Sequence, residues 1–140
     1  MIVLDTNVVS EGDKPLPDRH VLDWFAGHDP LSLFLCGPVM MELSYGAEMF
    51  FARTGSQRYL RTLGKVAERY NGRILDFDGG IPAITGKLRA RRDSIGRPIN
   101  IPDAMIAAIC LVHGATLATR NVRDFDGLDL KLVNPFEQAG

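Results

Sequence analysis

The sequence predicts an α/β fold in which helices cover both faces of a central, mostly parallel sheet of about five strands. Two observations lead to this prediction. Short apolar runs of strand length alternate with longer segments of helical periodicity. Turn segments rich in Gly and Pro, such as "GHDP", "CGP", "NGR" and "GRPINIP", separate these runs. Parallel strands joined by helices give a three-layer α/β/α architecture.

The apolar runs locate the individual elements. "IVLD", "LFLC", "RILDF", "ATLAT" and "KLVN" predict strands at 2–5, 33–36, 73–77, 115–119 and 131–134. The segments between them predict helices near 18–27, 39–53, 56–71, 81–95 and 102–113. We expect a single domain over residues 1–136, followed by a short C-terminal tail at 137–140.

The composition is typical of a soluble globular protein, with 46% hydrophobic and 24% charged residues. The longest apolar runs are shorter than the roughly 18 residues of a membrane span, and the N-terminus has a strand pattern rather than a basic leader. We therefore expect a cytoplasmic protein with no membrane association. Cys36 and Cys110 lie in apolar segments and are expected to be buried free thiols. The net charge of −1 gives no general argument for nucleic-acid binding.

Four acidic residues are expected to meet at one edge of the sheet. Carboxyl ends of parallel strands, and the amino ends of the helices that follow them, share an edge where ligands gather. The four acids lie at the end of the first strand, in the first turn of the helix after the second strand, in the first turn of the helix that begins "IPDAMIAA", and in the turn "NVRDF": Asp5, Glu42, Asp103 and Asp124.

Each acid also has an ordinary explanation when taken alone. Asp103 and Glu42 could stabilise a helix dipole, Asp5 could form a turn with the backbone after it, and Asp124 could be a solvated loop acid. Together, however, carboxylates about 5 Å apart repel one another by roughly 3 kcal/mol per pair, so a cluster suggests a bound cation. Oxygen ligands suit Mg²⁺ or Mn²⁺. Such ions promote phosphodiester hydrolysis by polarising phosphate and lowering the pKa of bound water.

Two further acids, Asp76 and Asp78 in "ILDFDGG", also follow a strand. Asp78 precedes a predicted helix start near Gly80, so we interpret it as an N-cap and leave it out of the site. The following segment "GGIPAITGK" does not match the GxxxxGK[ST] pattern, because isoleucine stands where the first glycine belongs and leucine follows the lysine. This excludes an ATP-binding phosphate loop.

The segments "MIVLDTNVVS", "VMMELSYGAE", "RPINIPDAMIAAI", "HGATLATRNVRDF" and "LVNPF" together resemble PIN-domain ribonucleases of the VapC toxin type, close to the FitB-like branch. The resemblance runs from Met1 to about Phe136. It implies a PIN-like fold, Mg²⁺- or Mn²⁺-dependent endoribonuclease activity, a homodimer, and a small cognate antitoxin with a DNA-binding domain. Carried over by position, the acidic site of the family falls on the four acids selected above. Asn121 replaces an acid found in some relatives, which leaves open whether the site binds one or two metal ions.

Other polar residues are expected to support the site. Residues beside the acids could orient carboxylates or water, although turn hydrogen bonding explains each as well: Thr6, Asn7, Thr119 and Asn121. Basic residues near the acids could bind an RNA backbone, although a solvated helix face is the alternative for those in "KLRARRDSIGR": Arg89, Arg92, Arg120 and Arg123. The large apolar residues of 39–71 suggest contact with a second copy or an antitoxin, or core packing.

Three functions from different classes remain open. The first is a metal-dependent endoribonuclease acting as the toxin of a toxin–antitoxin pair. The second is a receiver-like phosphoacceptor domain, which would need an acid pair at the first strand and a late lysine; "LDTN" and "LVNPF" supply neither. The third is a catalytically silent binding module of the same fold, against which the presence of all four acids argues.

Overall fold

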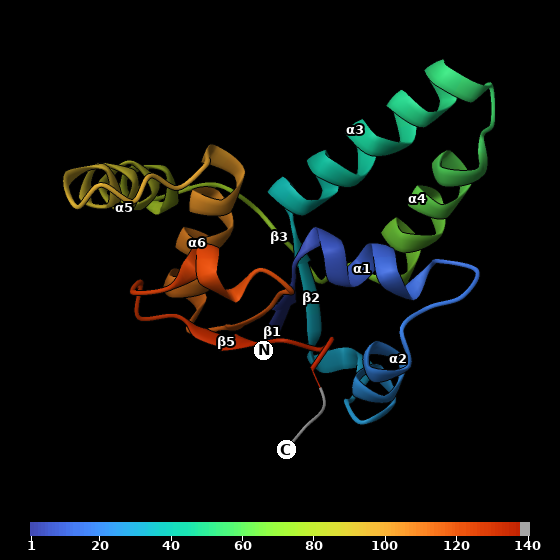
Figure 1. The fold of residues 1–140 in the computed structure, drawn as a ribbon, viewed down its shortest axis with the longest axis horizontal. Coiled ribbons are helices and arrows are strands. Elements are labelled where there is room, and N and C mark those ends of the chain that lie inside the picture. Colours follow the sequence, from blue (N-terminus) through green and yellow to red (C-terminus); the bar gives the residue numbers. More distant parts are fainter. Residues whose placement is uncertain (138–140) are drawn as a thin grey trace.

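The computed structural model describes residues 1–137, and its central sheet has five strands in the order β3-β2-β1-β4-β5. The paired strands all run parallel. They are β1 Ile2–Leu4, β2 Leu33–Cys36, β3 Ile74–Leu75, β4 Thr116–Ala118 and β5 Lys131–Val133. The predicted α/β fold with a central parallel sheet is confirmed, and helices complete a three-layer α/β/α arrangement (Figure 1).

The five predicted helices are present with small changes in their ends: α2 Arg19–Ala26, α3 Gly37–Thr54, α4 Arg58–Arg69, α5 Ile81–Ser94 and α6 Ile101–His113. Two short 3₁₀ helices, η1 Pro30–Ser32 and η2 Val122–Phe125, complete the connections before β2 and after β4. The interpretation of Asp78 as an N-cap is wrong. The cap of α5 is Gly80, and Asp78 contributes only its backbone carbonyl, which accepts from the Ile81 N–H at 3.1 Å.

One helix was not predicted. α1 Thr6–Gly12 follows β1 directly, with Asp5 as its N-cap. Its sequence "TNVVSEG" is short and contains β-branched residues and a glycine, which are poor helix formers. Tertiary packing compensates, because Val8 and Val9 are buried in the core.

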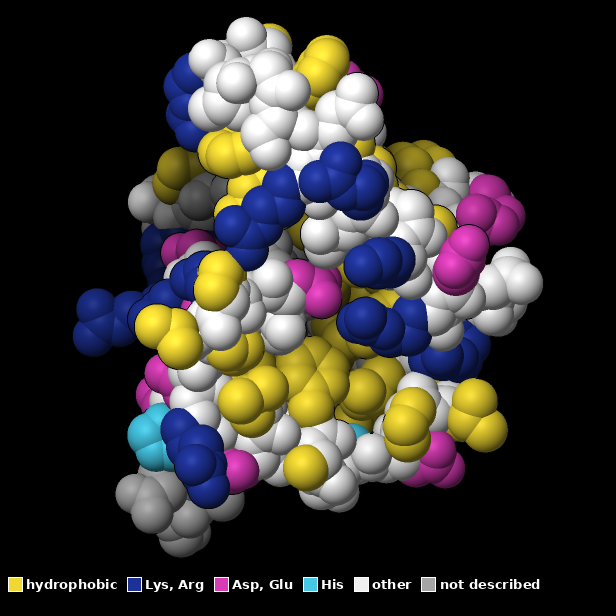
Figure 2. All heavy atoms as spheres, turned by 90° about the vertical axis from the view of Figure 1, so that its right-hand side faces the viewer, with side chains coloured by type: hydrophobic (Ala, Val, Ile, Leu, Met, Phe, Trp, Pro, Cys, Tyr) yellow, Lys and Arg dark blue, Asp and Glu magenta, His cyan; other side chains and the backbone are white. Residues whose placement is uncertain are grey.

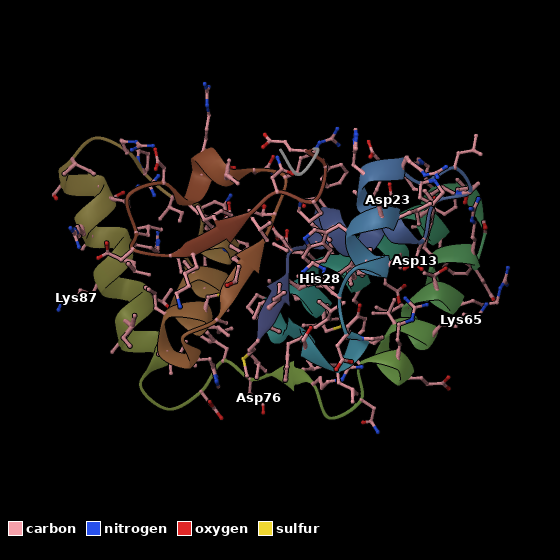
Figure 3. All side chains as sticks on the ribbon, turned by 90° about the horizontal axis from the view of Figure 1, so that it is seen from below. Asp13, Asp23, His28, Lys65, Asp76 and Lys87 are labelled. Atoms are coloured by element: carbon pink, nitrogen blue, oxygen red, sulfur yellow. The ribbon has the colours of Figure 1, made fainter. Side chains whose placement is uncertain are left out.

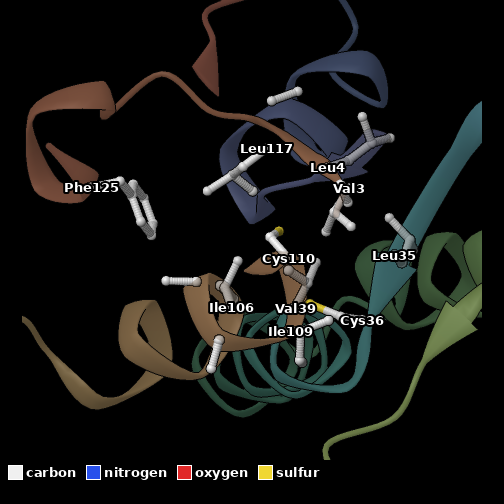
Figure 4. Packing of buried hydrophobic residues seen from close by; sticks show 14 of the residues in the cluster. Val3, Leu4, Leu35, Cys36, Val39, Ile106, Ile109, Cys110, Leu117 and Phe125 are labelled. Atoms are coloured by element: carbon white, nitrogen blue, oxygen red, sulfur yellow. The ribbon is translucent and has the colours of Figure 1, made fainter. Parts of the chain in front are cut away.

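The core lies between the sheet and the helices (Figure 4). Strand residues such as Val3 and Leu35 pack near Val39 of α3 and Ile109 of α6, and all four side chains have no exposed surface. α6 is the most deeply buried helix, with a nearly continuous run of small and aliphatic buried residues from Ala104 to Cys110. A rigid, buried helix therefore carries Asp103 at its first turn.

The strand order changes direction at β1. From β1 the chain moves outward through β2 and β3, and it then returns to place β4 on the other side of β1. The ladder continues just past the strands, because the N–H of Asp5 donates to the carbonyl of Ala118 at 2.9 Å. In parallel α/β sheets, ligands bind at such a switch point, beyond the carboxyl ends of the strands.

The long axis of the molecule runs from α5 at one end to the α3–α4 pair at the other (Figure 1). Figure 3 shows the same separation from below, with Lys87 of α5 and Lys65 of α4 at opposite ends. Within residues 1–137, no helix has both the length and the apolar character needed to cross a membrane. Of the tail expected at 137–140, residues 138–140 lie outside the described residues.

Candidate active site

Asp5 is the most enclosed of the four acids. It follows β1 and begins α1, and only 5% of its surface is exposed. Its Oδ1 accepts from the Thr6 N–H at 2.8 Å, and its Oδ2 accepts from Thr119 Oγ1 at 2.7 Å and from Asn7 Nδ2 at 3.5 Å. Burial raises the pKa of Asp5 above its ordinary value, against the opposing effect of these hydrogen bonds. Asp5 is thus both a helix cap and a charge held at the switch point.

Glu42 reaches the same region from α3. It lies in the second turn and not in the first turn as predicted, because the helix already begins at Gly37, with Pro38 in its first turn. A helix-dipole role for Glu42 is therefore weak, since that effect fades beyond the first turn. Its Oε1 instead accepts from Thr6 Oγ1 at 3.1 Å. Burial and then the charge of Asp5 raise the pKa of Glu42.

Asp103 lies in the first turn of α6, as predicted. The N-cap Asn100 was not predicted as part of the site: its Oδ1 accepts from the Asp103 N–H at 2.8 Å, and its Nδ2 donates to Asp103 Oδ2 at 3.0 Å. An asparagine shortly before Pro102 was the available sequence signal. Burial, followed by the charges of Asp5, Asp124 and Glu42, raises the pKa of Asp103 to about 6. The four carboxylates therefore influence one another across this edge.

Asp124 lies in η2, which follows β4. Together with Asp103 it lines a small cavity of about 110 Å³, whose other walls are Arg92, Pro98, Ile99 and Asn100. Asp124 is exposed, whereas the next residue, Phe125, is 1% exposed and anchors the short helix in the core. The structure thus brings together the four acids that the sequence singled out, from four separate segments of the chain.

Three of the four polar neighbours contact the acids through their side chains. Thr6 and Asn7 do so from α1, and Thr119 is fully buried between Asp5 and the β4–η2 connection. The backbone N–H of Asn121 donates to Thr119 Oγ1 at 3.0 Å, so Asn121 acts here through its backbone. Through these two hydrogen bonds, Thr119 couples the position of the Asp5 carboxylate to that of the β4–η2 connection.

The four acids offer oxygen ligands of the kind that Mg²⁺ and Mn²⁺ prefer. Among residues 1–137, no three Asp, Glu, His or Cys side chains converge closely enough in their present rotamers to surround an ion. The acids are nevertheless near enough to interact, since the charges of Asp5, Asp124 and Glu42 all raise the pKa of Asp103. The donor chemistry fits a divalent cation, and side-chain rotation would be needed to complete its coordination.

The four arginines differ in their environments. Arg89, Arg120 and Arg123 are exposed. Arg120 follows Thr119, and its guanidinium lies 4.4 Å from the centre of the Phe136 ring. Arg92 requires a correction, because it is 5% exposed and donates to backbone carbonyls, so it is not a free surface cation for an RNA phosphate.

The two cysteines are free and fully buried, as predicted. Burial raises the pKa of the Cys36 thiol to about 12, and it raises the pKa of Cys110 as well. Both thiols are therefore protonated near neutral pH and are poor nucleophiles or metal ligands. The chemistry of this edge rests on carboxylates.

Comparison with known proteins agrees with this architecture. Residues 2–130 match the PIN domain family. The chain is 37% identical to VapC ribonuclease Y4jK of Sinorhizobium fredii, covering 99% of this chain and 100% of that protein. It is 31% identical to toxin FitB of Neisseria gonorrhoeae, covering 97% and 99%. A solved structure of FitAB bound to an IR36 DNA fragment superposes with a TM-score of 0.89 at 29% identity, covering 100% of this chain and 99% of that one. The chain belongs to the PIN domain family.

Proposed function

We propose that this protein is the endoribonuclease toxin of a toxin–antitoxin pair and that it requires Mg²⁺ or Mn²⁺. The observation that supports this most directly is the group of four interacting carboxylates at the switch point. One of them, Asp103, has its pKa raised to about 6 by burial and by the other three. The ribonuclease and toxin names of its relatives support the same activity. Its RNA substrate would place the protein in the cytoplasm.

In this proposal, Asp5, Glu42, Asp103 and Asp124 hold the cation. When bound, a divalent cation polarises a phosphate oxygen and makes hydrolysis by water feasible at neutral pH. Hydrogen bonds within the protein hold three of these carboxylates in place, and the one to Asp103 comes from Asn100 Nδ2. Thr119 and the Thr6 N–H fix Asp5, and the Thr6 hydroxyl fixes Glu42. A single residue, Thr6, thus links two acids from β1 and α3.

Asp103 is suited to hold the cation. Burial and the neighbouring acids raise its pKa to about 6 in the cation-free protein, and a bound cation would stabilise its ionised form. Water attack on phosphorus would leave 5′-phosphate and 3′-hydroxyl ends.

The exposed arginines supply contacts for the RNA backbone. Arg120 and Arg123 flank the connection that carries Asp124, and Arg89 lies on the exposed side of α5. Positive charges beside an acidic pocket attract phosphates without reading sequence. Arg92 is left out of this set because its guanidinium is held inside the protein.

The antitoxin would occupy an apolar groove between α1, α3 and α4. The groove encloses about 330 Å³ and is lined mainly by apolar residues that include Leu43, Phe50, Tyr59, Leu63 and Val66. Lys14 and Arg53 also line it. Figure 2 shows this side of the molecule, where Lys and Arg side chains lie among exposed apolar side chains. An amphipathic helix with acidic flanks would match this groove in shape and charge.

We also propose a homodimer. Met41 and Tyr45 lie on α3 near Glu42 and are 52% and 67% exposed. Large apolar side chains this exposed on a helix beside the acidic site are suited to contact a second copy. Light scattering at micromolar concentration should give a dimer mass, and Tyr45→Glu should shift it toward monomer.

The activity is tested with purified protein from which the antitoxin has been removed. RNA should be cleaved in Mg²⁺ or Mn²⁺, cleavage should stop in EDTA, and Asp103→Asn should be inactive while folded. Product ends should be 5′-phosphate and 3′-hydroxyl. Products with 2′,3′-cyclic phosphate would contradict the mechanism, because they require attack by the ribose hydroxyl. Full activity in EDTA would contradict the metal requirement.

A further inference from the structure

Arg92 is a buried cation that is held by backbone carbonyls. It is 5% exposed, and its Nε donates to the carbonyl of Arg97 at 2.7 Å. Its Nη1 donates to the carbonyls of Asp124 and Asp126 at 3.2 and 3.3 Å. Among residues 1–137, no carboxylate lies within 4.0 Å of its guanidinium to form an ion pair. A buried charge without a carboxylate partner is costly, so its presence requires an explanation.

The three carbonyls lie on two segments that border the acidic site. Arg97 belongs to the connection between α5 and α6, and its N–H also donates to the carbonyl of Arg92 at 2.9 Å. Asp124 and Asp126 lie at the end of η2 and just after it. One side chain on α5 therefore ties the segment that leads to Asp103 to the segment that carries Asp124.

Asp124 has few other restraints. Its helix η2 is one short 3₁₀ turn whose N-cap, Asn121, makes no side-chain capping hydrogen bond. Burial of Phe125 holds the turn against the core and the Asp124 N–H donates to the Asn121 carbonyl at 3.0 Å, but neither restrains the carbonyl side of Asp124. The hydrogen bonds of Arg92 to the carbonyls of Asp124 and Asp126 restrain the backbone at Asp124 and two residues after it.

We propose that Arg92 is a positioning residue for the nuclease site, and that it acts by fixing the backbone at Asp124 and just after it. The inference rests on the proposed function, since it assigns Asp124 to the cation site. The cavity between them is consistent with this role, because Arg92, Asp103 and Asp124 line the same space of about 110 Å³.

The geometry requires arginine. The planar guanidinium donates from two nitrogen atoms in fixed directions, whereas the ammonium of lysine is a single compact group on a flexible stem. Arg92→Lys keeps the charge but cannot span the Arg97 carbonyl and the two η2 carbonyls together. Arg92→Gln removes the charge as well. If position is what matters, both variants should have the same defect.

The defect is measured as Mn²⁺ affinity by titration calorimetry on the full-length protein, with Mn²⁺ alone as the probe. Both variants should bind Mn²⁺ about tenfold or more weakly than the wild type, the range typical for loss of a residue that orients metal ligands. Arg91→Gln, at the exposed neighbouring position on α5, is the matched control and should bind like the wild type. Wild-type Mn²⁺ affinity in Arg92→Lys would overturn the proposal. Tighter Mn²⁺ binding in Arg92→Gln would also overturn it, because it would mean that the main effect of the Arg92 charge is to repel the cation.

A double-mutant cycle separates positioning from a general loss of stability. In an Asp124→Asn background, Arg92→Lys should change the Mn²⁺ affinity less than twofold, because the acid through which it acts is gone. In a Glu42→Gln background the full effect should persist. Equal losses in both backgrounds would overturn the proposal. A wild-type protein that binds Mn²⁺ and shows this coupling but cleaves no RNA would contradict the proposed nuclease function and leave the role of Arg92 intact.

Discussion

Thr119 and Asp5 are joined by a hydrogen bond of 2.7 Å although they lie 114 positions apart in the sequence. The bond crosses the switch point of the sheet, because Asp5 follows β1 and Thr119 follows β4. Thr119 Oγ1 also accepts a hydrogen bond from the backbone N–H of Asn121 while it donates to Asp5. One hydroxyl therefore holds both a backbone segment and a carboxylate. The position of the first acid thus depends on the segment that leads to the last one.

Removal of this bond should weaken cation binding. Thr119→Val has nearly the same shape but lacks the hydroxyl, so Asp5 loses a buried donor and its pKa should rise further. We expect the free energy of unfolding to fall by about 1–2 kcal/mol and the Mn²⁺ affinity to fall about tenfold or more. Thr119→Ser keeps the hydroxyl and should retain the affinity. Calorimetry on both variants tests this, and equal Mn²⁺ affinity in the valine and serine variants would contradict it.

Neutralising Asp5 should stabilise the metal-free protein. Asp5→Asn preserves the size of the side chain and removes a buried, repelled charge, but its amide nitrogen cannot accept the hydrogen bonds that Asp5 Oδ2 accepts from Thr119 and Asn7. In EDTA the net gain in unfolding free energy should therefore be about 1 kcal/mol. The wild type should gain about 2.7 kcal/mol from Mn²⁺ at a hundredfold excess over Kd, and the variant much less. Nuclease activity should fall by orders of magnitude.

Melting curves in EDTA and in Mn²⁺ provide the measurement for Asp5→Asn. Asp23→Asn is a suitable control, because Asp23 is an exposed acid of α2 (labelled in Figure 3), a helix that carries none of the four acids. It should leave the Mn²⁺ shift unchanged. Equal Mn²⁺ shifts in the wild type and in Asp5→Asn would show that Asp5 is only a capping residue.

The stability of the metal-free protein should decrease as pH rises from about 4 to about 6.5. The pKa of Asp103 is about 6 in the folded protein against an ordinary value of 3.8, so the folded state binds more protons than the unfolded state between these values. Its ionisation therefore opposes folding, by on the order of 1 kcal/mol after screening by solvent. Asp103→Asn should flatten this slope, as measured by denaturant unfolding in EDTA. A wild-type stability that increases through the window would contradict the prediction.

A charge in the α1–α3–α4 groove should block the antitoxin without affecting the nuclease. Leu63→Glu places a carboxylate in the apolar lining of the groove. We expect loss of co-purification with the antitoxin and retained RNA cleavage, because the change is remote from the acids. Leu31→Glu is the control, since Leu31 is 70% exposed and does not line this groove. An unchanged complex with Leu63→Glu would exclude the groove as the docking site.

The sequence was sufficient to predict the fold and the convergence of the acids, because each strand has a distinct apolar run and parallel strands share one carboxyl edge. It was insufficient where tertiary packing overrides local preference. α1 is an example, since Val8 and Val9 are poor helix formers that become helical by entering the core. The position of Glu42 was wrong by a turn because Gly37 and Pro38 were interpreted as a turn rather than as the start of the helix.

Arg92 shows a different limit. In "KLRARRDSIGR" it is one of several similar basic residues, and only its burial in the folded structure distinguishes it from the exposed Arg89 and Arg91. Its partners are backbone carbonyls of Arg97, Asp124 and Asp126, which have no signature in the sequence. The role of a side chain that binds only backbone cannot be predicted from residue types, because any residue offers the same carbonyl.

The central position of β1 also has a consequence during translation. β1 is synthesised before its partner β4, which begins at Thr116, and Asp124 follows later still. Since synthesis proceeds from the amino end, Asp5 cannot meet Thr119 and Asp124 until the segments that carry them have been made. A nascent chain that ends before Asp124 therefore lacks a complete acidic cluster. The proposed nuclease would be harmless to the ribosome and messenger that produce it until Asp124 has been added and this part of the chain has folded.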